Sequence, residues 1–135
     1  MSFVEWESNL DLGIKKIDEH HQHLVDILNN TYNAIILDSQ QAELEAIIGK
    51  LADYTTYHFT AEERLMTYHS FSGINKHLLE HEEFSRNVLD FQDMCSRGES
   101  IIAMDVLVFL RGWLINHILE VDREYATFLI KKGVT

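Results

Sequence analysis

Histidine and acidic side chains recur in this chain at intervals that place them on one face of a helix. His58 and Glu62 are four residues apart, and so are His77 and His81. Residues four apart in an α-helix differ by about 40° in direction, so both members of each pair point the same way. Imidazole and carboxylate groups are common ligands of transition metals. The spacing therefore predicts that each pair can chelate a metal ion, although a single such pair is weak evidence for a site.

The stronger signal is that several ionisable residues fall in register with the apolar residues of their own segments. They are His21, His58, Glu62, His77, His81 and His117. Burying one unpaired ionisable group costs several kcal/mol, so a small domain could not tolerate all of these without a shared partner. A metal uses the lone pair of each ligand. The pattern therefore predicts that the buried side chains converge on metal ions.

Such convergence requires long helices, and the apolar periodicity provides four of them. Apolar or histidine residues recur every three or four positions from His21 to Ile35, from Leu44 to Leu65, from Ile74 to Cys95, and from Val106 to about residue 132. The chain contains no proline, which permits long unbroken helices. Alternation with a period of two never persists, so a strand-based fold is not favoured.

Short breaks separate the four segments. We expect Asp38 and Ser39 to cap the second helix, residues 70–73 to separate the second from the third, and Ser100 to cap the fourth. Gly98 and Gly133 are expected at helix C-termini. Short connections favour antiparallel neighbours, which predicts an all-α fold, an up-down-up-down four-helix bundle. We expect one domain over residues 1–135, with an irregular arm over about 1–17 and the bundle over about 18–132.

The fourth segment contains a step in its periodicity. His117 and Asp122 are five residues apart, a separation of about 140° in a regular α-helix. The apolar seam shifts by one residue at the same place. We therefore predict either a local π-turn near residues 117–122 or a helix whose two flanks lie on either side of a pair of ions.

Composition and charge exclude several classes of protein. The chain has 135 residues and a formal net charge of −11, which argues against a nucleic-acid partner. No apolar run is long enough to span a membrane, and the N-terminus does not read as an export signal. The single cysteine cannot form an internal disulfide, in agreement with a reducing compartment. We therefore expect a cytoplasmic protein without a membrane partner. Its oligomeric state is not predicted.

These residues, together with their neighbours, resemble the ligand signature of the hemerythrin family, whose bacterial single-domain members (bacteriohemerythrins) are the most similar. The matching motifs are His58-Phe59-x-x-Glu62, His77-x-x-x-His81 and His117-x-x-x-x-Asp122, preceded by Ile17-Asp18-Glu19-His20-His21. The resemblance covers essentially the whole chain and fills every ligand position of the family pattern.

The resemblance implies a non-haem di-iron centre that binds O2 reversibly, for oxygen storage, transport or delivery, in a protein that is not an enzyme. His77, His81 and His117 would hold one iron, and His21 and His58 the other. Glu62 and Asp122 would bridge the two ions together with an oxo or hydroxo group. This set leaves one coordination position open on the iron with two histidines, where O2 or a small anion would bind.

The resemblance also implies an apolar O2 pocket next to the ligands. Its residues would be Leu24, Phe59, Trp113, Leu114 and Ile118, for which ordinary core packing is the alternative. Tyr125 is expected either to orient the Asp122 carboxylate or simply to pack in the core. Glu80, next to His81, is expected to face solvent; an inward orientation would argue against stable O2 binding. His20, His23 and His69 are interpreted as surface residues.

Other functions remain open at this stage. One is an O2-sensing or redox-sensing module that normally belongs to a longer signalling protein, and another is a di-iron enzyme. The metal is not fixed by the ligand types either, because imidazole and carboxylate also suit zinc and manganese.

Overall fold

The computed structural model describes residues 3–37, 41–98 and 100–135, and over these residues it contains helices and no strand. A short turn, η1 (Ser8–Leu10), precedes the first long helix. The helices that follow are α1 (Lys15–Ile36), α2 (Gln41–Tyr68), α3 (Ile74–Ser96) and α4 (Ser100–Asn116), and α4 continues through the π-helical segment η2 (His117–Asp122) into α5 (Arg123–Lys131).

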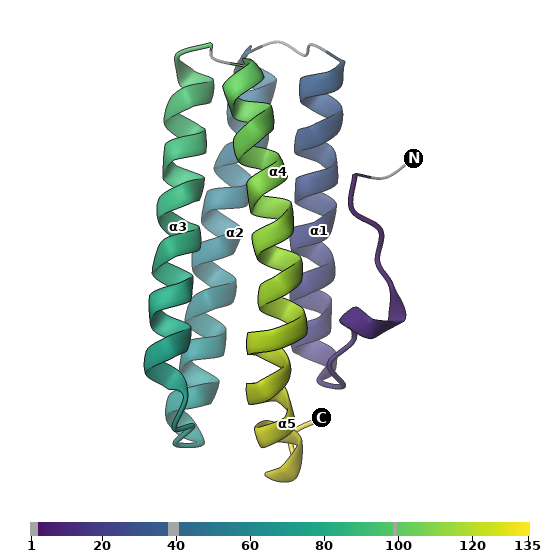
Figure 1. The fold of residues 1–135 in the computed structure, drawn as a ribbon, viewed down its shortest axis with the longest axis vertical. Helices are drawn as coiled ribbons and strands as arrows, with labels where there is room; N and C mark the ends of the chain where they lie inside the picture. The colour runs from purple at the N-terminus through teal and green to yellow at the C-terminus, as the bar shows by residue number, and fades with distance from the viewer. Residues whose placement is uncertain (1–2, 38–40, 99) are drawn as a thin grey trace.

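The four rods lie side by side, as Figure 1 shows, with α4, η2 and α5 forming one of them. α1 packs on α2, α2 on α3, α3 on α4, and α4 on α1, so the helices follow one another around the bundle. The chain reverses direction at each short connection. The predicted four-helix bundle is therefore confirmed. None of the described helices combines the length and the apolar character that crossing a membrane requires.

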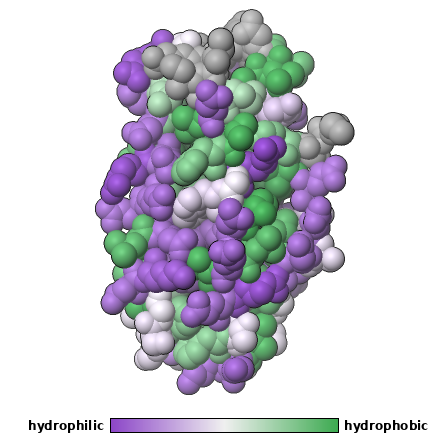
Figure 2. All heavy atoms as spheres, in the orientation of Figure 1, coloured by the Kyte–Doolittle hydropathy of each residue, from purple (hydrophilic) through white to green (hydrophobic). Residues whose placement is uncertain are grey.

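The core lies between the four rods, where the periodic residues of the sequence meet. On α3 the buried residues are those predicted from the spacing, namely His77, His81, Phe84, Val88, Phe91 and Cys95. The side of the molecule seen in Figure 2 is mostly hydrophilic, with hydrophobic residues scattered over it. The three-and-four spacing thus sorts the residues of each rod into an inner and an outer face.

The ends of α2, α3 and α5 agree with the sequence signals, whereas the start of α1 does not. α2 ends and α3 begins on either side of residues 70–73. Gly98 and Gly133 have φ values of +77° and +88°, the left-handed region that glycine adopts without strain. After α5, the Val134 N–H donates back to the Leu129 carbonyl at 3.1 Å, which closes the helix end. The predicted caps at Asp38 and Ser39 and the side chain of Ser100 lie outside the described residues.

The N-terminal arm is shorter than expected and is bonded to the bundle. α1 begins at Lys15, three residues before the predicted start of the bundle. The Asp18 carboxylate accepts the backbone N–H groups of Leu12 at 2.8 Å and Gly13 at 3.2 Å, so it holds the preceding turn against the first turn of the helix. The side chain of Asn29 on α1 bonds both the N–H and the C=O of Val4, at 2.7 and 2.9 Å. These bonds attach the arm to the bundle.

The step in the fourth rod is a π-turn, which confirms the first of the two predicted alternatives. Residues His117–Asp122 form η2, between regular α-helix on both sides. A π-turn accommodates one additional residue and so brings position i+5 back toward position i. As a result His117 and Asp122 are both buried and face the same part of the core.

Candidate metal centre

All four rods contribute buried ionisable side chains to the middle of the bundle. His21 comes from α1, His58 and Glu62 from α2, His77 and His81 from α3, and His117 and Asp122 from η2. Each of these seven residues is at most 3% exposed. The structure therefore brings together every residue that the sequence predicted as a metal ligand.

The seven side chains form two groups, each compact enough to hold one metal ion. His77, His81, His117 and Asp122 form one group, and we call it the three-histidine group. His21, His58 and Glu62 form the other, which we call the two-histidine group. In each group the potential ligand atoms lie within 4.8 Å of one another. The resemblance stated above implies the same division, with three histidines on one side and two on the other.

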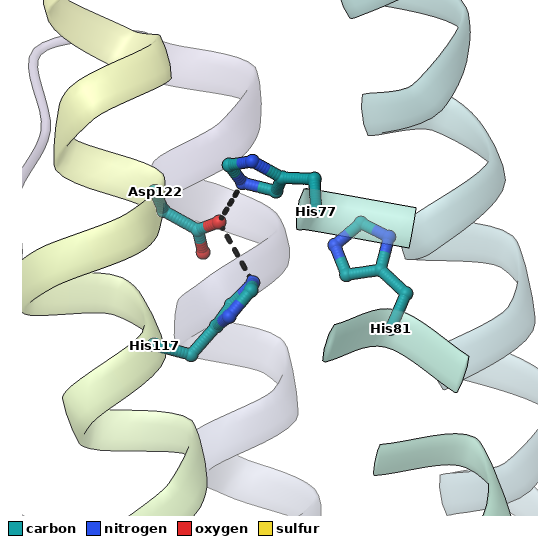
Figure 3. Close-up of side chains that lie close together, drawn as sticks. All are labelled: His77, His81, His117 and Asp122. Carbon is teal, nitrogen blue, oxygen red and sulfur yellow. Dashed lines mark hydrogen bonds and ion pairs between the residues drawn. The ribbon is translucent and has the colours of Figure 1, made fainter. Parts of the chain in front are cut away.

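Asp122 makes contacts with histidines of both groups. Its Oδ1 lies 2.9 Å from the Nε2 atoms of both His77 and His117, contacts drawn as dashed lines in Figure 3. Its Oδ2 lies 3.1 Å from the Nε2 atom of His21 in the two-histidine group. One carboxylate oxygen is thus directed at each group.

Glu62 connects the groups in a similar way from α2. Its Oε1 lies 3.0 Å from Nε2 of His58 and 3.4 Å from Nε2 of His81. Its Oε2 lies 3.8 Å from Nε2 of His21 and accepts a hydrogen bond from the Tyr125 hydroxyl. Of the two alternatives predicted for Tyr125, packing in the core is confirmed, since the residue is fully buried, and a bond to Asp122 is wrong, since the hydroxyl donates to Glu62.

The two buried carboxylates make this region strongly attractive to positive charge. Desolvation by burial alone would lower the pKa of His21, but its contacts with Asp122 and Glu62 outweigh burial and raise that pKa to about 10. The pKa of His117 is also raised, against desolvation, chiefly by the charge of Asp122. Burial would raise the pKa of both carboxyl groups, but the surrounding histidines hold those of Glu62 and Asp122 well below their usual range.

The donor atoms fit metal ions better than they fit one another. Several buried atoms have no hydrogen-bond partner among the described residues, although they point at this centre: Nε2 of His21, His58, His81 and His117, Oε1 of Glu62 and Oδ2 of Asp122. Their short contacts lack hydrogen-bond geometry. Buried polar atoms normally have hydrogen-bond partners. A set of buried lone pairs that converge on one place without such partners is typical of metal ligands. The residues present therefore fit two metal ions.

Three further residues contact the outer nitrogens of the histidines. The Nδ1 atom of His81 lies 2.9 Å from Oε2 of Glu63, and that of His117 lies 3.4 Å from Oε1 of Glu80. The Nδ1 atom of His58 lies 2.9 Å from Nδ1 of His20. Outer partners of this kind fix the orientation of a ligating imidazole. Sequence reasoning missed Glu63, whose only signal is that it follows Glu62.

Two of these contacts correct the interpretation of the sequence. His20 is buried, 6% exposed, and not a surface residue as predicted. Desolvation by burial and the nearby charge of His58 lower the pKa of His20 to about 4, so it is neutral at pH 7. Glu80 was expected to face solvent, but its carboxylate turns back to the outer side of the His117 ring, not into the space between the two groups. His23 is exposed and His69 is half-buried.

Apolar and aromatic side chains surround the two groups, and they include the five predicted for an O2 pocket. Leu24, Phe59, Leu114 and Ile118 are at most 4% exposed, and Trp113 is half-buried against the core. The Phe59 ring stacks on His81 with 3.8 Å between centroids, and Trp113 stacks on His117 at 4.5 Å. These rings restrict the histidine rings and keep their surroundings apolar.

Comparison with known proteins agrees with this geometry. Residues 12–129 match the family model described as the hemerythrin HHE cation binding domain. The bacteriohemerythrin of Stenotrophomonas maltophilia (strain R551-3) is 32% identical over 126 residues, which cover 93% of this chain and 81% of the relative. That of Clostridium acetobutylicum is 31% identical over 125 residues, 89% of this chain and 96% of the relative. A crystal structure of wild-type hemerythrin has a TM-score of 0.84 at 25% identity and covers 93% of this chain and 97% of its own.

Proposed function

The chain belongs to the hemerythrin family, and from that premise we propose that it binds O2 reversibly at a non-haem di-iron centre, for oxygen storage, transport or delivery. The three-histidine group would hold one iron through His77, His81 and His117. His21 and His58 would hold the other. Glu62 and Asp122 would bridge the two ions together with an oxo or hydroxo group.

The observation that carries this proposal is the position of the two carboxylates. Asp122 directs one oxygen at His77 and His117 and the other at His21. Glu62 likewise lies between His58 and His21 on one side and His81 on the other. Two separate mononuclear sites would not require each carboxylate to contact histidines of both groups. A dinuclear centre uses bridging groups of this kind between its ions.

When two iron ions are bound, they supply the redox chemistry that lets O2 be taken up and released. The protein controls which molecules reach these ions. Fully buried apolar side chains, such as Leu24 and Ile118, exclude water from the surroundings of the ligands. Tyr125 holds Glu62 in place through its hydroxyl hydrogen bond. Small anions, which also seek an open metal position, are the competitors that this apolar pocket disfavours.

Neutral imidazoles dominate the ligand set, five against two carboxylates, and this favours a carrier over an enzyme. Few anionic ligands make highly oxidised iron harder to reach, so O2 can leave intact. The relatives named above are hemerythrins and bacteriohemerythrins, and members of this family are oxygen-binding proteins. The sensing module and the di-iron enzyme are therefore not favoured. We also propose a cytoplasmic location, supported by the lone, buried Cys95.

The test is the metal content and the absorption spectrum of the purified protein. We expect iron at about two ions per chain, as the two ligand groups predict, and bands of an oxo-bridged ferric pair in air. These bands should disappear with dithionite, and a new spectrum should appear on exposure to O2 and reverse when O2 is removed. A protein that binds zinc or manganese and no iron, or whose reduced form does not respond reversibly to O2, would refute the proposal.

A further inference from the structure

A groove runs along the outer side of the bundle between the first half of α1 and the second half of α2. It encloses about 580 Å³, and its lining includes Lys16 and His20 from α1 and Tyr57, Arg64 and Tyr68 from α2. A space of this size is typical of sites for small organic ligands and cofactors. The O2 proposal does not use this groove.

The charges along the groove favour an anion. Lys16 lies on one wall and Arg64 on the other, and no carboxylate belongs to the described lining. Neither cation is within ion-pair distance of a carboxylate in the part of the chain that the structure describes. The chain as a whole has twice as many acidic as basic residues, 22 against 11. The groove therefore differs from the acidic chain as a whole, because two cations without a carboxylate partner lie on its opposite walls and attract negative charge.

The surface between the two cations suits a flat ring. Tyr57 and Tyr68 are 55% and 83% exposed, although tyrosine rings are largely apolar. Ile17 and Leu65 add aliphatic surface to the same groove. Planar aromatic groups stack on such rings, and their anionic substituents can reach a lysine or arginine at the rim. The groove thus combines the two features that a planar aromatic anion requires.

His20 links the groove to the metal centre, because it lines the groove and contacts His58. In the proposed di-iron centre His58 binds metal through Nε2, so its Nδ1 carries the proton and donates to Nδ1 of His20, 2.9 Å away. Since His20 accepts through Nδ1, its own N–H is on Nε2, and this N–H remains as the donor of a residue that lines the groove. An anion that accepts this N–H polarises the His20 ring and makes it a stronger acceptor for His58.

We propose that the groove between α1 and α2 binds a planar aromatic anion of flavin-nucleotide size, held by Lys16 and Arg64, and that the bound ligand modulates the metal centre through His20. The binding part stands on the groove alone. The modulation rests on the proposed di-iron function, because it acts through His58.

Binding is tested with three probes that separate the ring from the charge. Flavin mononucleotide has both, riboflavin has the ring without the phosphate, and inorganic phosphate has the charge without the ring. Titration followed by flavin fluorescence or calorimetry should show one flavin mononucleotide per chain, riboflavin binding about tenfold more weakly, and no measurable binding of phosphate. Equal affinity for the two flavins, or no binding of flavin mononucleotide, would overturn the proposal.

Two double variants with the same change in net charge locate the site. Lys16→Gln with Arg64→Gln should weaken the binding of flavin mononucleotide about tenfold, because both rim cations are lost. Lys76→Gln with Lys131→Gln removes two exposed lysines of α3 and α5 outside the groove, and it should leave the affinity unchanged. An equal loss in both double variants would show that the flavin responds only to overall charge, and it would contradict the site.

Modulation is tested by comparing iron-loaded with metal-free protein. Because coupling between two sites is reciprocal, the affinity for flavin mononucleotide should differ between the two forms, and the difference should disappear in His20→Phe, which keeps a ring without its nitrogens. The same difference in His20→Phe, or no difference in the wild type, would contradict the coupling. If the protein proves not to bind iron, the O2 proposal fails, whereas the double variants still decide whether the groove binds the flavin.

Discussion

The two halves of the metal centre differ in what lies behind their histidines. In the three-histidine group, two of the rings face carboxylates, since Nδ1 of His81 contacts Glu63 and Nδ1 of His117 contacts Glu80. In the two-histidine group, Nδ1 of His58 contacts the neutral ring of His20. The Nδ1 atom of His21 is buried and has no hydrogen-bond partner among the described residues.

This difference implies that the two metals are held unequally. A carboxylate that accepts the outer N–H of a ligating imidazole makes the ring a stronger donor, and a neutral imidazole does so less. The three-histidine group therefore has more nitrogen ligands and also more basic ones. The two-histidine group is the weaker half, and it is also the half in which we expect the open position for O2. The metal ion that we expect to be held less tightly is thus also the one at which we expect O2 to bind.

The largest expected effect follows from removing the carboxylate that contacts both halves. In Asp122→Asn, we expect the loss of both metals, because the amide removes the negative charge near His21, His77 and His117 while nearly preserving side-chain size. Metal analysis of the purified variant should find almost no iron.

The matched control for this variant is Glu120→Gln. It makes the same change in charge on an exposed residue of the same π-helical segment, and it should keep both ions. If Asp122→Asn retained one tightly bound iron, Asp122 would contribute to one half of the centre only, and its bridging role would be contradicted.

The sequence predicted most of this arrangement because the candidate ligands follow the helical period. His77 and His81 lie on the same seam as Phe84 and Val88, so a single pattern predicted both the helix and its inner face. The π-turn could be predicted for the same reason. When the apolar residues of a helix shift by one position, the backbone must accommodate one additional residue.

The outer partners could not be predicted, because they depend on how neighbouring helices cover one another. His20 lies one position before His21 and therefore off the seam of α1. It is buried because α2 covers it, with the rings of Tyr54 and Tyr57 at 5.8 and 5.3 Å from its own. The start of α1 was missed for a local reason: Ile14 precedes the helix without a side-chain cap, so no residue type marks the boundary.

Removing the metals should expose the charge imbalance of the centre as a dependence of stability on pH. In the metal-free protein the pKa of His21 is raised from 6.5 to about 10, and that of His117 is raised as well. A raised folded-state pKa contributes stability that is fully present below the unfolded-state value and is lost as pH rises through the folded-state value. The free energy of unfolding should therefore fall between pH 6.5 and 10, by an amount on the order of 5 kcal/mol.

Urea denaturation at pH 6 and at pH 9 measures this effect. The iron-loaded protein is the control. Metal binding keeps its ligand imidazoles neutral over the whole interval, so its stability should stay nearly constant. The carboxylates do not contribute there, since Glu62 and Asp122 are ionised in the folded and the unfolded chain throughout it. A metal-free protein that is equally stable at both pH values would show that its histidines are neutral when no metal is bound.

The smallest effect, and the sharpest test of the comparison, concerns the two outer carboxylates. Glu63→Gln should weaken retention of the metal in the three-histidine group about tenfold, the range seen when outer-shell partners are removed. Glu80→Gln should do less, because its contact with His117 is 3.4 Å against 2.9 Å for Glu63 and His81. Glu83→Gln, an exposed position on the same helix as Glu80, should have no effect.

Release of iron to a chelator, followed over time, distinguishes the two halves directly. The wild type should release its metals in two phases, the first from the two-histidine group, because only the other group has carboxylates behind its histidines. In the Glu63→Gln and Glu80→Gln double variant the second phase should approach the first. A single phase in the wild type would mean that the bridging carboxylates bind both ions as one unit, so that the outer partners orient the rings without ranking the two halves.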